Sequence, residues 1–182
     1  CSDEHMDFPG TLTLRAATLH AILDDLRSSL TTHGFEAIVV FSAHGGNEAV
    51  LADLATKGRS PGPGCRWIVL HGLAALSEIQ HRASSRFGVT PEEAGHHAGE
   101  FETSILLSVS PDEVRRSELA PGLVRGLDDP QSVFYPSLRP HAPTGTVGDP
   151  RTARGARAKA YLDAWADHLV KSYREAIRPK IP

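Results

Sequence analysis

Cysteine, methionine and long apolar runs are scarce in this sequence. Of its 182 residues, two are cysteine and one is methionine. Cys1 and Cys65 are too few for the multi-bridge framework of a small secreted domain, so we expect a reducing, cytoplasmic location. No stretch approaches the ~18 consecutive apolar residues of a membrane span, and no secretory signal pattern is present. We therefore expect no membrane contact.

A strong excess of either charge is also absent. Lys and Arg number 19 and Asp and Glu number 22, which gives a formal net charge of -3. This balance, without long basic runs, excludes the positive footprint of a nucleic-acid-binding protein and favours a small-molecule partner. Hydrophobic residues make up 40% of the chain, enough for a substantial core, so residues 1–182 are expected to form a single domain.

Apolar periodicity predicts alternating helices and strands. Continuous, largely β-branched runs predict buried strands over 37–41 and 67–70, with a helix over 48–57 between them. Further helices are predicted over 19–30, 73–87, 97–109 and 151–177. The order strand, helix, strand predicts an α/β fold with a parallel sheet. The Pro- and Gly-rich segment 111–150 is expected to be an ordered surface excursion or an oligomer contact.

The first candidate site is the motif SAHGGN, which follows the first predicted strand. His44 lies at the carboxyl end of that strand, where open α/β sheets bind ligands. Gly45 and Gly46 leave the next helix N-terminus open to a carbonyl oxygen or an anion. A structural histidine beside a glycine turn explains the same motif, and the hexapeptide alone does not separate the two interpretations.

The second candidate is the motif HHAGEFETS. On a helix, His97 and Glu100 lie three residues apart on one face, a spacing that suits two ligands of one metal ion. Glu102 lies to the side and is a candidate for orienting a ligand or moving a proton. The alternative is that both glutamates complement the helix dipole while His96 and His97 are solvated loop residues.

A third candidate lies near residue 1, where Glu4 and His5 precede a Pro-Gly turn. Such a pair is common on protein surfaces, so the pattern by itself has low specificity. We place Glu4 and His5 among the candidate substrate contacts, together with Asn47 and His96 and the two glycines of the first motif.

Four motifs, in order and at these separations, resemble the creatininase family of metal-dependent amidohydrolases: EHMDFPGTLTL, HGFEAIVVFSAHGGN, HAGEFETSILLSVSPDEV and GTVGDPR. That family includes creatinine amidohydrolases, pyrimidine-nucleotide deformylases and the peptidase of mycofactocin maturation. The resemblance covers essentially the whole chain, although 111–143 carries no motif. It implies a three-layer α/β/α sandwich with a mostly parallel sheet, and a homo-oligomer, often a hexamer. It also implies hydrolysis of a C–N bond in a small amide, cyclic amide, formamide or short peptide.

The resemblance assigns roles to individual residues. His44 matches a ligand of a dinuclear centre, which Zn, Mn or Fe would suit. Some relatives carry a second-metal carboxylate where this chain has Gly46, and Glu100 would take that role here. His97 matches the histidine that polarises or protonates the substrate, and Glu102 matches the acid that supports it. For His97 we follow the resemblance, which prefers catalysis to metal ligation.

Two departures from the family pattern bear on substrate and partners. Creatinine hydrolases have an acidic residue where this chain has His96, and the family's active-site tryptophans have no counterpart, so creatinine is not the expected substrate. Members of the family begin with a strand and a motif that supplies a Glu, a His and a bridging Asp to the metals. The resemblance therefore predicts an N-terminal fragment or second chain that supplies these ligands. Cys1 would arise at a domain boundary or by autoproteolytic processing of a precursor at the bond before it, and we favour processing.

Two functions of other kinds stay open. Cys1, with a free α-amine and a thiol, suits an N-terminal-nucleophile amidase or acyltransferase. Alternatively, the chain is a non-catalytic subunit that completes a partner's active site.

Overall fold

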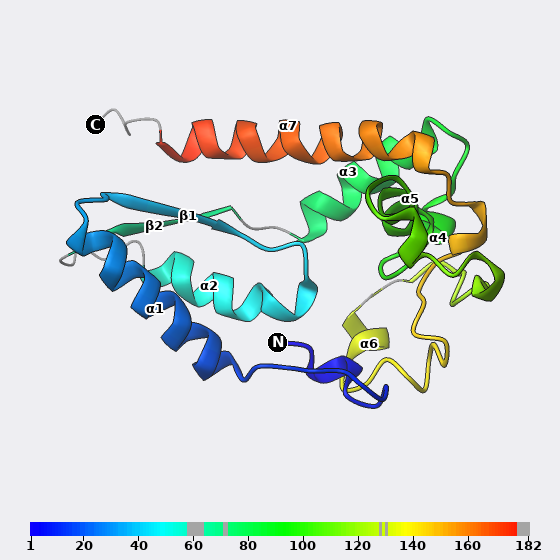
Figure 1. Cartoon of the computed structure of the whole chain (residues 1–182), viewed down its shortest axis with the longest axis horizontal. Coiled ribbons are helices and arrows are strands. Elements are labelled where there is room, and N and C mark those ends of the chain that lie inside the picture. Colours follow the sequence, from blue (N-terminus) through cyan, green and yellow to red (C-terminus); the bar gives the residue numbers. More distant parts are fainter. Residues whose placement is uncertain (58–63, 71–72, 128, 130, 178–182) are drawn as a thin grey trace. The chain divides into compact units, whose positions relative to one another are not determined.

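The computed structural model describes residues 1–57, 64–70, 73–127, 129 and 131–177 (Figure 1). Backbone contacts divide the chain into two compact units. Unit 1 comprises residues 1–2, 12–73 and 168–182, and unit 2 comprises residues 3–11 and 74–167. The single domain expected from composition stays a prediction.

Unit 1 is built on a strand, helix, strand sequence. Its elements are α1 (Ala16–Thr32), β1 (Ala37–Phe41), η2 (Gly45–Asn47), α2 (Glu48–Lys57), β2 (Arg66–Leu70) and the second half of α7 (Ala158–Ile177). The two strands pair in parallel, with Ala37 opposite Arg66 and Phe41 opposite Leu70. The predicted strands and the helix between them are therefore confirmed, with β2 beginning one residue earlier than the apolar run.

Helices α1 and α2 lie on the same side of the strand pair (Figure 1). Side chains alternate between the two faces of a strand, and Ile38 and Val40 pack with Trp67 in a core that α1 and α2 complete. On β1 the intervening residues Val39 and Phe41 are 42% and 54% exposed. The sequence predicted a strand buried on both faces, and this part of the prediction is wrong for β1 because α1 and α2 lie on the same side.

Helix α1 ends as its sequence predicts. Gly34 has a φ of +80°, a backbone conformation that costs glycine little. The amide of Phe35 donates to the carbonyl of Leu30 at 3.1 Å, which closes the last turn of the helix.

Unit 2 is mainly helical. Its elements are η1 (Asp3–His5), α3 (Leu73–Ser85), α4 (Pro91–Ala94), α5 (Glu100–Val109), η3 (Pro111–Glu113), η4 (Arg116–Glu118), α6 (Gln131–Phe134), η5 (Pro150–Thr152), η6 (Gly155–Arg157) and the first half of α7 (Ala158–Ile177). One core joins α3, α5 and α7 through Ala83, Phe101 and Tyr161. A second core gathers Val133, Leu138, Ala142 and Val147 with Phe8.

Two predicted helices begin later than expected. The helix predicted from residue 97 begins at Glu100, because the backbone of His97 forms an antiparallel bridge with Val147 instead. The helix predicted from residue 151 begins at Ala158. Arg154 is extended, and its amide donates to the Ser104 hydroxyl at 2.9 Å rather than within a helix. In both places a contact distant in sequence replaces the helical hydrogen bond.

Two expectations from composition are tested by the described residues. Cys1 and Cys65 are both free thiols, with Cys65 buried in unit 1. Across the described ranges, no helix is long and apolar enough to cross a membrane.

Candidate functional site

The loop after β1 holds His44 against the first two residues of the chain. His44 Nε2 lies 2.6 Å from the carbonyl oxygen of Cys1 and 3.1 Å from the hydroxyl of Ser2. The Ser42 hydroxyl fixes this loop, because it accepts the His44 amide and the Asn47 side-chain amide, both at 3.1 Å. All five residues belong to unit 1.

The glycine pair in this loop permits a close approach. A Cβ on Gly46 would lie 2.0 Å from the Cys1 carbonyl oxygen and 2.7 Å from His44 Nε2, so a side chain there is excluded. Gly45 and Gly46 lie in η2, whose N-cap residue is His44. Asn47 accepts the Cys1 nitrogen at 2.6 Å. The face that the sequence left open for a ligand is thus occupied by Cys1.

His97 lies in a tight turn of unit 2 whose geometry Glu102 fixes. The backbones of His97 and Val147 exchange hydrogen bonds of 3.2 and 2.8 Å. Ala98 follows with a φ of +51°, a left-handed conformation that is unfavourable for a residue with a Cβ. The Ala98 amide donates to Glu102 Oε2 at 2.5 Å. Glu102 therefore stabilises the strained turn that directly follows His97.

A second histidine stacks on His97. The ring centroids of His5 and His97 are 4.6 Å apart, with 36° between the ring planes. Glu4 Oε1 lies 3.4 Å from His5 Nε2, and Glu4 is only 3% exposed. Burial raises the pKa of Tyr135, and the Glu4 carboxylate adds to that rise. The structure thus brings together three predicted site residues, Glu4, His5 and His97.

Glu100 lies in a closed network instead of an open site. Its side chain is 0% exposed, and Oε1 accepts Arg157 Nη1 at 2.6 Å and the Ser104 hydroxyl at 2.8 Å. The Tyr161 hydroxyl donates to Oε2 at 2.9 Å. Burial, followed by the charge of Glu100, raises the pKa of Tyr161 to about 12. This arrangement favours a structural role for Glu100, and His97, which precedes the helix, does not share its helical face.

His96 faces away from this group toward α3. Its ring meets that of His81 edge to face, with centroids 5.6 Å apart. Burial lowers the pKa of both histidines. His81 Nε2 is buried and has no hydrogen-bond partner among the described residues. The surroundings of His96 therefore favour its neutral form.

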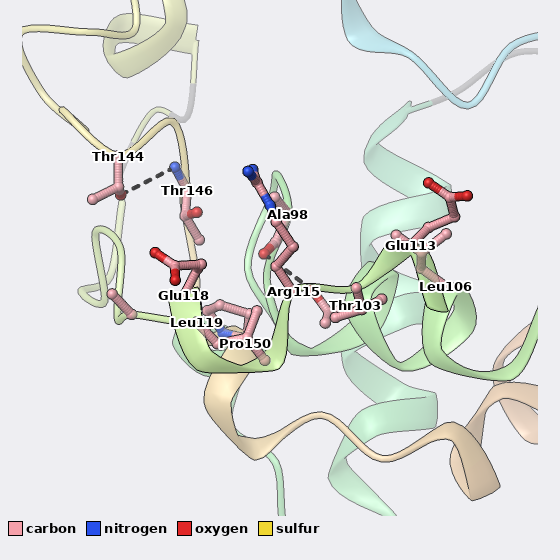
Figure 2. Close-up of a pocket in the computed structure, with 12 residues that line it drawn as sticks. Ala98, Thr103, Leu106, Glu113, Arg115, Glu118, Leu119, Thr144, Thr146 and Pro150 are labelled. Carbon is pink, nitrogen blue, oxygen red and sulfur yellow. Dashed lines mark hydrogen bonds between the residues drawn. The ribbon is translucent and has the colours of Figure 1, made fainter. Parts of the chain in front are cut away.

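A pocket of about 280 Å³ opens beside the His97 turn. Figure 2 shows five of the residues that line it: Ala98, Thr103, Arg115, Glu118 and Thr146. Most of the lining residues come from the segment 111–150, and of these Thr146 and Pro150 lie in the GTVGDPR motif while the others lie outside the four motifs or at the end of one. Several lining side chains are apolar: Leu106, Val114, Leu119 and Pro150.

The predicted site residues fall into two groups. Cys1, His44, Gly45, Gly46 and Asn47 belong to unit 1, whereas the others belong to unit 2: Glu4, His5, His96, His97, Glu100 and Glu102. Sequence reasoning missed Ser2, Arg157 and the pairing of Tyr161 with Glu100. Ser2 lies among the polar residues just before Glu4 and His5, and this was the signal that could have found it. The partners of Glu100 lie 57 and 61 residues away from it in the sequence, so no local pattern indicates them.

The described side chains do not by themselves fit a metal centre. Within the ranges given above, no group of three or more His, Cys, Asp or Glu side chains is arranged to hold an ion. A carbonyl oxygen can only accept, so His44 Nε2 donates its proton to Cys1, and only Nδ1 of this ring could offer a lone pair to a metal. The Glu100 carboxylate is already bound by three protein donors.

Known proteins resemble the chain along most of its length. The family model described as "Creatininase: Creatinine amidohydrolase" matches residues 1–173. A mycofactocin precursor peptide peptidase of Mycolicibacterium smegmatis is 30% identical over 163 residues, covering 87% of this chain and 56% of the relative. A creatinine amidohydrolase of Pseudomonas putida is 26% identical over 190 residues, covering 94% of this chain and 68% of the relative.

Solved structures show the same fold. A structure named "Creatininase Mn" superimposes with a TM-score of 0.66 at 24% identity, covering 94% of this chain and 68% of that one. A creatininase mutant described as "Zn-Zn type" gives a TM-score of 0.64 at 22% identity, with the same coverage. The predicted creatininase-like α/β fold is confirmed. The chain spans 56% and 60% of the length of two mycobacterial peptidases that it matches. With 173 consecutive residues matched by its model, the chain belongs to the creatininase family.

Proposed function

We propose that the protein hydrolyses a C–N bond in a small amide, cyclic amide, formamide or short peptide. The relatives support this class, because a peptide peptidase and a creatinine amidohydrolase are both named for cleavage of such bonds. The pocket beside Ala98, at about 280 Å³, falls just below the usual range of roughly 300–1,000 Å³ for small-molecule sites, which is compatible with a small substrate.

The observation that carries the proposal is the turn at His97. Its backbone is fixed on one side by Val147 and on the other by the bond from Ala98 to Glu102. A proton donor must be held in a set direction to act on a leaving nitrogen. A strained turn that is hydrogen-bonded to the Glu102 carboxylate can fix this direction. His97 would protonate or polarise the substrate, and Glu102 would keep its turn in place.

Metal dependence is a separate part of the proposal. It is supported by the names of the Mn and Zn-Zn creatininase structures. Since the described side chains do not complete a centre, no step is derived through a metal. The predicted dinuclear state, the homo-oligomer, the second chain with the remaining ligands and the cytoplasmic location likewise stay predictions.

Cys1 makes structural contacts in the described part of the chain. Its carbonyl accepts His44 and its side chain packs against the α1 and α2 core. No catalytic partner for the thiol is among these contacts, so the nucleophile hypothesis gains no support from them. It stays a prediction, as does that of a non-catalytic subunit.

The test is amine release from a panel of substrates after metal removal and reloading. Chelator-treated protein is reloaded with Mn²⁺ or Zn²⁺ and incubated with an N-formyl amino acid, a cyclic amide, a short peptide and creatinine. We expect hydrolysis of at least one of the first three, and loss of that activity on renewed chelation. No amine release above the blank with either metal would reject the proposed function. Activity that survives complete metal removal would reject only its metal dependence.

A further inference from the structure

The stacked pair of His5 and His97 joins two segments that are distant in sequence. A centroid separation of 4.6 Å places the two rings in contact with a tilt of 36° between their planes, and Phe134 meets both rings edge-on at 6.3 and 6.4 Å. The buried Glu4 carboxylate lies beside His5 at 3.4 Å. Three ionisable groups therefore meet in a small and largely enclosed space.

Packing of the backbone sets this geometry. The His5 carbonyl accepts the Phe8 amide at 2.9 Å and the Thr11 hydroxyl at 3.0 Å, which closes the turn that carries the ring. The Leu138 amide donates to the Glu4 carbonyl at 3.0 Å.

The same core also holds the segment that pairs with His97. Phe8 packs against the core that includes Leu138 and Val147, and Val147 bonds to the backbone of His97. The backbone segments that carry His5 and His97 are therefore both held by the same hydrophobic core.

We propose that Glu4 and His5 are positioning residues for His97. This inference rests on the catalytic role proposed for His97. His5 holds the plane of the His97 ring by stacking, and Glu4 favours the charged form of His5.

The geometry leads to an expected order of protonation for the pair. A carboxylate beside an imidazole favours the imidazolium, so we expect His5 to take up the first proton. A second positive charge on a ring whose centroid is 4.6 Å away is disfavoured, so we expect His97 to release its proton more readily than an isolated histidine. That property suits a group that gives a proton to a leaving nitrogen.

Other charged or titratable groups surround this cluster. Asp3 lies in the same turn as Glu4. Tyr135 follows α6, and its pKa is raised by burial and further by the charges of Glu4 and Asp3. Glu102 lies on α5 and is bonded to the residue after His97. His96 precedes His97, but its ring packs on His81. Among the described titratable groups named here, we expect the coupling to come from His5, whose ring contacts that of His97.

The test is a pH titration of the imidazole nitrogens by NMR in ¹⁵N-labelled protein, which needs no substrate. In His5→Phe, which keeps a flat ring without a charge, the protonation midpoint of His97 is expected to rise by about one pH unit. In Glu4→Gln the midpoint of His5 is expected to fall. The control His141→Phe changes an exposed histidine of the same unit and should leave both midpoints unchanged.

Each result decides the proposal. Unchanged midpoints of His97 in His5→Phe and of His5 in Glu4→Gln would overturn it. His5→Gln gives a second neutral variant if His5→Phe fails to fold. Coupled titration in a protein that hydrolyses none of the panel substrates would leave the pairing intact while rejecting the proposed function. Hydrolysis without coupled titration would do the reverse.

Discussion

The hydroxyl of Tyr161 donates to Oε2 of Glu100 at 2.9 Å, and both side chains are fully buried. Arg157 supplies the opposite charge at 2.6 Å from Oε1. A buried carboxylate is stable only when its oxygens are paired and hydrogen-bonded, and here α5, η6 and α7 each contribute a group. This network therefore ties the helix that carries Glu102 to the last helix of the chain.

Replacing Glu100 is expected to destabilise the fold strongly. In Glu100→Gln the Arg157 guanidinium loses its partner, and breaking a buried pair costs roughly 3–5 kcal/mol. Urea denaturation measures the change in free energy of unfolding. The control is Asp163→Asn, which breaks the exposed pair with Lys159 and should cost less than about 1 kcal/mol.

The same variant separates two interpretations of Glu100. Loss of bound metal with a free energy of unfolding equal to that of the control would contradict the structural role and restore the metal ligand predicted from the sequence. Loss of stability with unchanged metal content supports the structural role.

Tyr161 is expected to make stability fall at high pH. Its pKa rises from an ordinary 10.0 to about 12 in the folded protein, chiefly through burial. Because the folded state keeps the hydroxyl neutral, the stabilisation is fully present below about pH 10 and is lost as the pH rises through about 12. Urea midpoints measured across this range should fall in the wild type and fall less steeply in Tyr161→Phe. Parallel curves for the two proteins would refute the assignment.

The local sequence pattern predicted the elements whose packing partners lie close to them in the sequence. β1 has the predicted bounds because its apolar run packs directly on α2, and α1 ends near Gly34 because the glycine takes a positive φ. The sequence pattern predicted that helix α5 begins at residue 97, which is too early. The reason is that His97 pairs with Val147, a residue about fifty positions away.

The candidate site was found in the sequence only as separate motifs. Motif residues pointed to His97 and Glu102, but their spacing suggested a shared metal face for His97 and Glu100 that the fold does not form. The stack of His5 on His97 and the bond from Tyr161 to Glu100 join residues that share no periodicity, so no local pattern predicts them.

The turn before His97 is expected to tolerate no side chain at Gly95. A Cβ there would lie 2.0 Å from the Val147 carbonyl oxygen, and Gly95 has a φ of +76°. Gly95→Ala should therefore lower the free energy of unfolding by more than about 2 kcal/mol, as measured in urea. The control is Gly126→Ala, where the nearest atom to the new Cβ is 3.8 Å away. Equal stability of the two variants would show that the approach of Val147 to Gly95 is not as close as described.

We infer that His97, in a turn held by Glu102, donates a proton to the leaving nitrogen or polarises the substrate in C–N bond hydrolysis. The most direct measurement is kcat/KM of His97→Gln on a substrate that the wild type hydrolyses, with His141→Gln as the exposed control and circular dichroism to verify folding. Loss of a positioned proton donor should reduce kcat/KM by about 100- to 10,000-fold, while the control keeps the wild-type value. A folded His97→Gln protein with wild-type kcat/KM would contradict the account.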